Sequence, residues 1–262
     1  MDEILYEMTD GIGVLTINRP EARNALNWAA QEGFAAVVEE AAHDPSLRVL
    51  IVTAAGEQAF ASGGDLKELN DHPDVAAGER LSRVMSGALA RLTELPVPVI
   101  AAVNGDAVGG GCEIMTACDL RMATAGTRFR FAQVQVALTT GWGGTARFVR
   151  LIGQSRALEL LLTGRSFDAQ EAVEIGFVHR LVPQSSNVLV SARAWADLLV
   201  GLPKEALAAT KQLVQASGRL SLPEVYQLES RLFAGLWAQA DHLEALAAFV
   251  EKREPQFGNG YE

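Results

Sequence analysis

Cysteine is scarce in this sequence, and so is positive charge. The chain of 262 residues contains two cysteines, Cys112 and Cys118, which lie six positions apart in one expected helix and do not share a face of it. We expect no disulfide between them and infer a reducing, cytosolic location. The net charge of −10 argues against a nucleic-acid backbone or an anionic membrane surface as the ligand.

Long apolar runs and several catalytic motifs are also missing. No apolar run approaches the ~20 residues of a membrane span, and the acidic start MDEILYEM lacks the apolar core of a secretory signal. The sequence contains no GxxxxGK, HExxH or GxSxG pattern, which argues against a P-loop enzyme, a zinc protease and an α/β-hydrolase. The histidines lack the spacing of metal ligands, so we expect no metal site.

The composition predicts a globular chain of the α/β (α+β) class. Hydrophobic residues make up 49% of the sequence and the mean hydropathy is +0.13, which suits one large domain or two unequal ones. Strand and helix patterns alternate as far as residue 182, and helical patterns follow from residue 188. We therefore predict a core of residues 1–186 and a helical domain of residues 187–262.

Local patterns give the expected elements. Strands are expected at 3–8 and 12–18, joined by a hairpin at Asp10-Gly11, and at 49–53, 97–103, 119–123, 129–131 and 177–182. Helices are expected at 27–42, with Asn27 as N-cap, and at 65–69, 81–95, 112–118, 145–152, 156–162, 168–174, 188–200, 203–216, 222–239 and 241–252. Residues 54–64 and 133–140 are expected to be loops.

The stretch NGDAVGGGCEIMTACD, residues 104–119, carries the strongest chemical signal. An expected buried strand precedes it, and the glycines Gly109 to Gly111 lead into an expected helix. A helix start leaves backbone N–H groups free and favours negative charge, and glycine lets a ligand come close to them. Glu113 follows within one helical turn. The alternative is that the glycines only allow close packing of helix and strand.

Two further glycine turns repeat this arrangement. Gly63-Gly64 precedes Asp65, which stands at a plausible N-cap, and Gly141-Trp142-Gly143-Gly144 precedes an expected helix at Thr145. Two turns that each expose amides near a carboxylate favour a site for a negatively charged group over a purely structural role.

Five segments carry a resemblance that spans nearly the whole chain. AFASGGDLKEL (59–69), AAVNGDAVGGGCEI (101–114), GWGGTARF (141–148), GFV (176–178) and FVEKR (249–253) resemble the enoyl-CoA hydratase/isomerase (crotonase) family, in its order and spacing. The resemblance implies a crotonase/ClpP-like spiral of ββα turns, with a C-terminal helical part that supports a homotrimer or a dimer of trimers. It implies an acyl-CoA thioester as substrate and no cofactor beyond the coenzyme A of that substrate.

The resemblance also implies catalytic residues. Two backbone N–H groups, of Gly64 and Gly110, would hold the thioester oxygen while an enolate forms, and Glu113 would act as the acid or base. The second glutamate of the family's hydratases falls on Gln133. Glutamine can place a water molecule by hydrogen bonds but cannot act as an acid or base, so efficient hydration by two carboxylates is not expected.

The binding residues that the resemblance implies form three groups. Backbone groups of two loops would contact coenzyme A, and Asp65 lies beside the second loop. The C-terminal segment would contact coenzyme A on a neighbouring subunit, although its basic residues also suit a solvated helix end. These residues are Asn24, Ala25 and Leu26; Ala61 and Ser62; and Phe249 and Lys252.

Two other functions stay open at this stage. The stretch from Phe129 to Thr145 resembles the ethylmalonyl- and methylmalonyl-CoA decarboxylase branch of the family, and so do Leu236-Trp237 and Glu244-Ala245. Trp142 would then be an apolar wall beside the substrate carboxylate, or else an ordinary packed aromatic residue. The missing second carboxylate also suits a non-catalytic accessory subunit that binds acyl-CoA.

Overall fold

The computed structural model describes residues 2–69 and 71–258. The strands are β1 (Ile4–Thr9), β2 (Ile12–Ile17), β3 (Val49–Ala54), β4 (Ala59–Ala61), β5 (Val99–Val103), β6 (Asp106–Val108), β7 (Leu120–Thr124), β8 (Arg128–Arg130), β9 (Ser166–Asp168) and β10 (Arg180–Val182). The α-helices are α1 (Trp28–His43), α2 (Leu66–Leu69), α3 (Val75–Glu94), α4 (Gly110–Ala117), α5 (Gly144–Ile152), α6 (Gln154–Thr163), α7 (Ala169–Glu174), α8 (Val188–Val200), α9 (Lys204–Ser217), α10 (Leu222–Trp237) and α11 (Ala240–Glu251). Short 3-10 turns are η1 (Pro20–Ala22) and η2 (Gln133–Val136).

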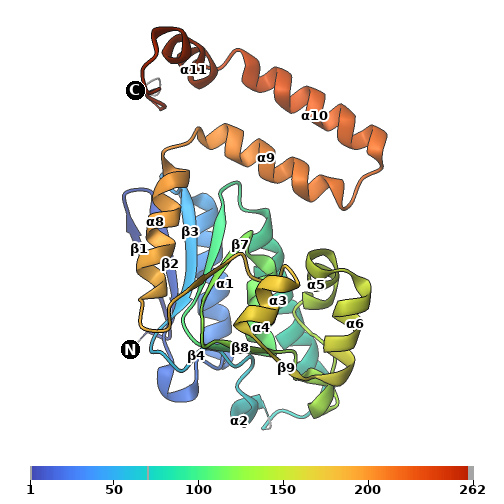
Figure 1. The fold of residues 1–262 in the computed structure, drawn as a ribbon. Coiled ribbons are helices and arrows are strands. Elements are labelled where there is room, and N and C mark those ends of the chain that lie inside the picture. The colour runs from blue at the N-terminus through green and yellow to red at the C-terminus, as the bar shows by residue number, and fades with distance from the viewer. Residues whose placement is uncertain (1, 70, 259–262) are drawn as a thin grey trace.

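Within the described residues, a sheet of six strands runs in the order β1-β2-β3-β5-β7-β10 (Figure 1). The β1–β2 pair is antiparallel, and the strands that follow are parallel. The hairpin predicted at Asp10-Gly11 is confirmed, since both residues have positive φ, 51° and 78°.

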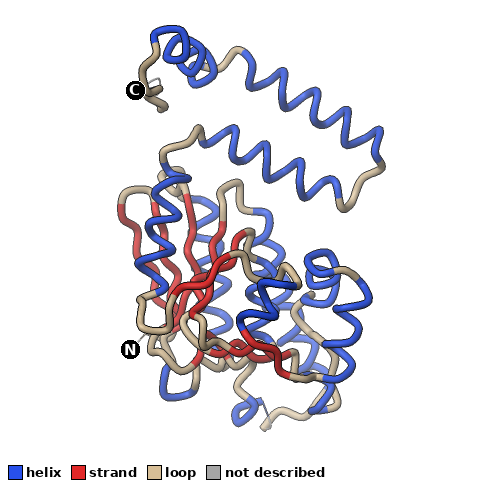
Figure 2. Tube along the Cα trace, viewed as in Figure 1, coloured by secondary structure: helices blue, strands red, loops and turns tan. Residues whose placement is uncertain are grey.

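Helices cover both faces of this sheet (Figure 2). In β3, Leu50 and Val52 point into the larger core with α1, α3 and α4, whereas Ile51 points into a smaller core with α8. Because successive side chains of a strand alternate between faces, a strand buried on both sides is apolar throughout. The run VLIVTA of β3, buried at every position, fits this rule.

A smaller sheet, of four strands in the described chain, has the order β4-β6-β8-β9 and lies below the first in Figure 1. The sequence predicted β8 but missed β4, β6 and β9, because strands of three residues are too short for an alternation pattern. Its core side is aromatic: Phe129, Phe167 and Phe177 lie with ring centroids 5.5–5.9 Å apart. This sheet carries the chain into α2 and α4, where the glycine turns lie.

Two predicted boundaries are wrong. Helix α3 begins at Val75 instead of 81, because the Asp74 carboxylate caps it by accepting the N–H of Ala77, and Gly78 lies inside the helix. The strand expected at 177–182 is confined to Arg180–Val182. Phe177 is in the aromatic core instead, and its carbonyl accepts the Nε–H of buried Arg121 at 2.6 Å.

The last three helices extend away from the core (Figure 1). Helix α9 is attached by polar side chains: Lys211 Nζ lies 2.6 Å from the Asp119 carboxylate, and Gln215 donates to the carbonyl of Thr93. Helix α10 has no buried residue. Helix α8 packs on the large sheet, so the division at residues 186 and 187 stays a prediction. In the described part of the chain, no helix is long and apolar enough to cross a membrane.

Candidate active site

Two glycine turns from distant parts of the chain meet at the start of α4. Gly63 has φ of 92°, and a Cβ placed on it would lie 2.9 Å from the amide nitrogen of Gly110. A Cβ on Gly111 would collide with the carbonyl oxygen of Ala61. The backbones approach so closely that only glycine fits at these positions.

The amides of Gly64 and Gly110 are both free within the described chain. Gly64 pairs with Leu26 in a parallel bridge, in which Leu26 donates to the Gly63 carbonyl and Asp65 donates to the Leu26 carbonyl. This pairing turns the Gly64 N–H away from Leu26. The N–H of Gly110 is the first of α4, and neither amide has an acceptor among the described residues. Both are therefore able to bind a ligand oxygen.

The indole of Trp142 covers one side of Gly110. A Cβ on Gly110 would lie within 2.7 Å of three ring atoms of Trp142, and the tryptophan is only 4% exposed. The ring therefore belongs to the core and also borders the Gly110 amide, while its role as an apolar wall beside a substrate carboxylate stays a prediction.

Glu113 is buried, 2% exposed, and its carboxylate accepts four hydrogen bonds from described residues. Oε2 accepts the backbone N–H groups of Trp142 at 2.8 Å and Gly144 at 2.9 Å. Oε1 accepts the Gln133 side chain at 2.9 Å and the backbone N–H of Gly141 at 3.2 Å. The carboxylate thus occupies the N-terminus of α5, where the helix dipole favours an anion.

Opposing effects act on the pKa of Glu113. Burial raises the pKa of this carboxyl above its ordinary value, because the charged form loses its hydration, and the hydrogen bonds from Gly144, Trp142, Gly141 and Gln133 offset part of the rise. A carboxyl group with a raised pKa is better suited to exchange a proton near neutral pH than an exposed glutamate is.

Gln133, the position to which the resemblance assigned the family's second glutamate, lies beside Glu113. Its Nε2 donates to Glu113, which fixes the orientation of the amide because the opposite orientation would bring two acceptors together. Its Oε1 is buried without a hydrogen-bond partner among the described residues. An unpaired buried acceptor is costly, so this oxygen is suited to accept a hydrogen bond from a ligand or a water molecule.

The loop at 24–26 joins these turns to the rest of the core. The N–H groups of Asn24, Ala25 and Leu26 are all donated within the chain, to the carbonyls of Arg19, Ala22 and Gly63. The Asn24 side chain is buried and donates to the carbonyls of Ala55 and Ala59. Because these N–H groups already donate to carbonyls of the protein, a ligand at this loop must contact other groups, such as the carbonyl of Asn24.

Asp65 is held by Arg19. The guanidinium lies 3.0 Å from the Asp65 carboxylate. Burial raises the pKa of Asp65, but the hydrogen bond from Arg19 and the amide of Lys67 outweigh it and hold the pKa below its ordinary value. Asp65 therefore fixes the Gly63–Gly64 turn as an ionised group.

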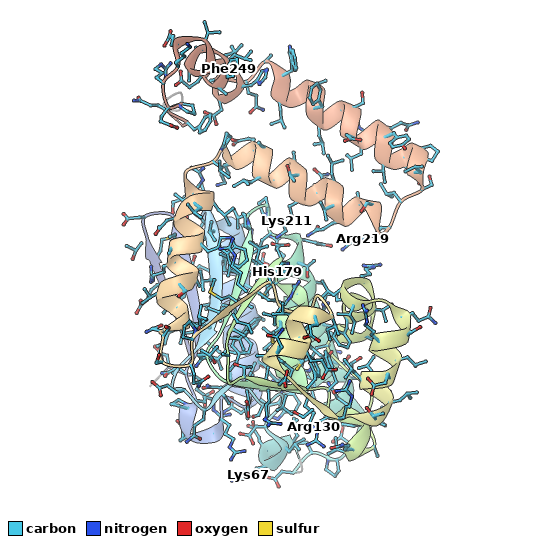
Figure 3. The ribbon with its side chains drawn as sticks, viewed as in Figure 1. Lys67, Arg130, His179, Lys211, Arg219 and Phe249 are labelled. Atoms are coloured by element: carbon cyan, nitrogen blue, oxygen red, sulfur yellow. The ribbon has the colours of Figure 1, made fainter. Side chains whose placement is uncertain are left out.

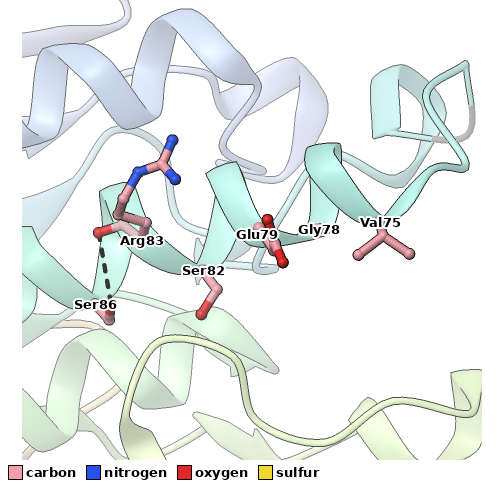
Figure 4. Close-up of a pocket in the computed structure, with 6 residues that line it drawn as sticks. All are labelled: Val75, Gly78, Glu79, Ser82, Arg83 and Ser86. Atoms are coloured by element: carbon pink, nitrogen blue, oxygen red, sulfur yellow. Dashed lines mark hydrogen bonds between the residues drawn. The ribbon is translucent and has the colours of Figure 1, made fainter.

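Two hollows lie on the described chain, both lined by residues outside the glycine turns. An open groove of about 750 Å³ runs along α3 and is lined by Val75, Gly78, Glu79, Ser82, Arg83 and Ser86 (Figure 4). Ser82 donates to the carbonyl of Gly141 at 2.7 Å, so the groove reaches the turn that binds Glu113. A second hollow of about 460 Å³ is lined by Pro20, Glu21, Asn24 and residues 55–59.

Phe249 and Lys252 do not join the other predicted residues. Phe249 lies at the opposite end of the molecule from Lys67, which follows the Gly63–Gly64 turn (Figure 3), and it is 82% exposed. The sequence also missed Arg147 and Ser82, which contact the 141–144 turn. The spacing of Arg147 from Gly143 was visible, but nothing in it indicated a contact. No cluster of metal-binding side chains occurs in the described residues.

Comparison with known proteins identifies the fold and the family. A model of the enoyl-CoA hydratase/isomerase family matches residues 7–260. This chain belongs to that family. It is 36% identical over 256 residues to a probable enoyl-CoA hydratase from Mycobacterium bovis, with 98% of each chain covered. It is 34% identical over 254 residues to a short-chain-enoyl-CoA hydratase from Clostridium acetobutylicum, with 97% of each chain covered.

Solved structures agree with the sequence comparison. The crystal structure of an enoyl-CoA hydratase from Bacillus anthracis matches with a TM-score of 0.92 at 33% identity, covering 97% of this chain and 98% of that one. The family resemblance and the crotonase fold inferred from the sequence are therefore confirmed. The chain is an enoyl-CoA hydratase-like enzyme of the acyl-CoA-dependent crotonase family.

Proposed function

We propose that the amides of Gly64 and Gly110 bind the carbonyl oxygen of an acyl-CoA thioester and stabilise the enolate that forms on it. The observation that carries this proposal is that the Gly63–Gly64 turn lies against Gly110, more than forty residues away in sequence, that neither the Gly64 nor the Gly110 amide has an acceptor in the described chain, and that the carboxylate of Glu113 on the same helix is buried. Preorganised donors in a dry site stabilise developing charge with little reorganisation. Each such donor lowers the activation barrier by roughly 3–4 kcal/mol.

Glu113 moves the proton, and Oε1 is the oxygen that does so. Oε2 is bound by two backbone amides at 2.8 and 2.9 Å. Oε1 is bound by a side chain and by the longest of the four bonds, 3.2 Å from Gly141. A carboxylate that accepts four hydrogen bonds must give one up to bind a proton or a water molecule. Oε1 does so with the smallest rearrangement.

Hydration of a 2-enoyl-CoA is the reaction that we propose first. The oxygen of water bonds to C3, the electron pair of the C2=C3 bond moves onto the thioester as an enolate, and Glu113 takes the proton of the water. Glu113 then returns this proton to C2, and the enolate collapses to a 3-hydroxyacyl-CoA. Gln133 Oε1 accepts a hydrogen bond from the attacking water. With one carboxylate in place of two, we expect slow hydration.

Decarboxylation of a malonyl-type CoA ester is the second candidate. The observations that favour it are the neutral Gln133 and the indole of Trp142 against Gly110. Loss of CO2 leaves the electron pair on the enolate, so no strong base is needed to begin. Glu113, the orphan oxygen of Gln133 and the indole would each disfavour a bound carboxylate more than the neutral product.

We propose an orientation for the bound thioester from the positions of the two hollows. The acyl chain extends into the groove along α3 (Figure 4), where Ser82 donates to the carbonyl of Gly141. Coenzyme A lies near the loops at Asn24–Leu26 and Ala61–Ser62, by the hollow at Pro20. We expect no cofactor other than this coenzyme A, and a cytoplasmic location stays a prediction.

We also propose a homotrimer or a dimer of trimers. Large apolar side chains are exposed on α10 and α11, including Phe233 at 63%, Trp237 at 56% and Phe249 at 82%. Apolar surface of this kind marks an interface, and a second copy is the partner we propose. Phe249 and Lys252 then contact coenzyme A on a neighbouring subunit. Light scattering should give the mass of three or six chains, and Phe233→Glu should lower it.

A panel of thioesters tests the function directly. We expect crotonyl-CoA to gain the mass of water when wild type is added, and Glu113→Gln to slow this gain roughly 100-fold. Loss of CO2 from methylmalonyl- or ethylmalonyl-CoA, without hydration, would establish the second candidate. Micromolar binding of these esters by calorimetry, with no turnover of any, would leave only an accessory acyl-CoA-binding subunit.

A further inference from the structure

The turn at Gly141–Gly144 is held from behind by Arg147, on the first turn of α5. Nη2 of Arg147 donates to the carbonyl of Trp142 at 2.6 Å. This carbonyl lies between the two amides, of Trp142 and Gly144, that bind Oε2 of Glu113. The guanidinium therefore faces one side of the turn while the carboxylate binds the other.

Thr116, on α4, provides the second hydrogen-bond acceptor for the Arg147 side chain. Nε of Arg147 donates to the Thr116 hydroxyl at 3.1 Å. That hydroxyl donates in turn to the backbone carbonyl of Glu113 at 2.6 Å. Arg147 is thus joined to Glu113 by two routes, one through the turn and one through the backbone of α4.

Arg147 makes no ion pair with any carboxylate of the described chain, although it is half-buried. Burial lowers its pKa, and the charge of Glu113 across the turn opposes this change. A partly buried cation that donates only to neutral groups is costly. Its placement bears on Glu113, because its charge faces that carboxylate across the turn, one of its bonds holds the turn that binds the carboxylate, and the other reaches the backbone of Glu113 through Thr116.

We infer that Arg147 is a positioning residue: it holds the Gly141–Gly144 turn so that three amides bind Glu113 and the Trp142 indole stays against Gly110. This inference rests on the proposed function, in which Glu113 moves the proton and Gly110 binds the thioester oxygen. Arg147 touches neither of them and acts through the turn.

Other charges around Glu113 are few. Arg147 is the charged group that faces it from α5. Gln133 of η2 is neutral, and burial keeps the neighbouring Cys112 thiol protonated by raising its pKa. The core residues that β4 and α3 contribute around α4, such as Phe60 and Met85, are apolar. Loss of the Arg147 charge should therefore raise the pKa of Glu113.

The test compares Arg147→Gln and Arg147→Lys with a matched control, Arg156→Gln, an exposed arginine on α6. Carbon-13 NMR of the glutamate carboxyls, with Glu113 assigned from Glu113→Gln, gives the pKa without turnover. We expect Glu113 to titrate at higher pH in Arg147→Gln, at an intermediate pH in Arg147→Lys, and at the wild-type pH in Arg156→Gln.

Kinetics give a second measurement. With the thioester that wild type turns over, kcat of Arg147→Gln should fall roughly 100-fold with KM within about twofold, and the acid limb of the pH profile should move to higher pH. If wild type turns over no thioester, the proposed function fails, while the NMR result still decides the role of Arg147.

A second variant, Thr116→Val, tests the inference if Arg147→Gln does not fold. It keeps the charge of Arg147 but removes one of its two acceptors, so a smaller rise in the pKa of Glu113 is expected. A folded Arg147→Gln protein with an unchanged Glu113 titration would overturn the inference. Unchanged titration in both Arg147→Lys and Thr116→Val would do the same if Arg147→Gln does not fold.

Discussion

Helices α4 and α5 begin in the same way and are used in opposite ways. Each follows a glycine with positive φ, Gly109 at 55° and Gly143 at 78°, and each has glycine as its first residue. The first amide of α5 binds Glu113, whereas the first amide of α4 has no acceptor in the described chain. One helix start is neutralised by a side chain of the protein, and the other is left for the charge of a ligand.

The residue that links these two helix starts is Glu113. It stands on the first turn of α4, yet its carboxylate fills the start of α5. Trp142, from the turn before α5, covers Gly110 at the start of α4. The geometry of each helix start therefore depends on the other. A substitution at either one should change the positions of groups at both.

Blocking the free helix start should have the largest effect. A methyl group on Gly110 would collide with the Trp142 ring, so Gly110→Ala should displace the indole or the amide and reduce thioester turnover roughly 10³-fold. Gly87→Ala is the control, since a Cβ there meets nothing within 4 Å and alanine should stabilise the α3 interior by about 0.5–1 kcal/mol. Wild-type turnover by a folded Gly110→Ala protein would contradict the assignment of this amide.

Removing the charge of Glu113 from the start of α5 should have the second largest effect. Glu113→Gln removes the charge and points an NH2 group at N–H donors, because the carboxylate accepts four hydrogen bonds from the described residues. We expect turnover to fall roughly 100-fold and the protein to lose about 1–3 kcal/mol of unfolding free energy. Urea unfolding and steady-state kinetics measure the two losses. A variant as stable as wild type would show that α5 does not need this anion.

Adding a second carboxylate should have an intermediate effect. Gln133→Glu places a like charge where Nε2 now lies 2.9 Å from Glu113, so the two groups should share a proton and titrate as a pair at raised pKa values. We expect hydration of crotonyl-CoA to rise about tenfold, since a second acid or base becomes available. If hydration falls while decarboxylation of malonyl-type esters is retained, the second candidate function gains support.

The pH dependence of stability should give the smallest effect. Burial raises the folded-state pKa of Glu113 above its ordinary value, so the contribution of this group to the unfolding free energy is fully present at pH values below the ordinary pKa. The contribution is lost as pH rises through the folded pKa, by about 1.4 kcal/mol per unit of the rise. The difference in unfolding free energy between wild type and Glu113→Gln should therefore decline with pH. If this difference increases with pH instead, the hydrogen bonds from the amides lower the pKa of Glu113 by more than burial raises it.

Much of the fold and part of the site could be predicted from the sequence. Long strands and helices have a clear period, as in β3 and α1, where the cap at Asn27 is confirmed by its bond from the Ala30 amide. The resemblance to the family assigned Gln133 to the position of a second glutamate, and in the structure its side chain lies next to Glu113. Strands β4, β6 and β9 and the start of α3 could not be predicted, because pairing partners and a local cap decide them.

The order of residues was enough to indicate the kinds of groups present: glycines where backbones must touch, one glutamate one turn into α4, and glutamine where a second carboxylate was expected. It also carried the family. The folded arrangement was needed to reveal that Gly63 lies against Gly110, that Glu113 caps α5, that Arg147 contacts the turn, and that Phe249 lies far from the site. The reason is that local patterns record which face of an element is apolar, whereas contacts between distant turns depend on how the sheets bring them together.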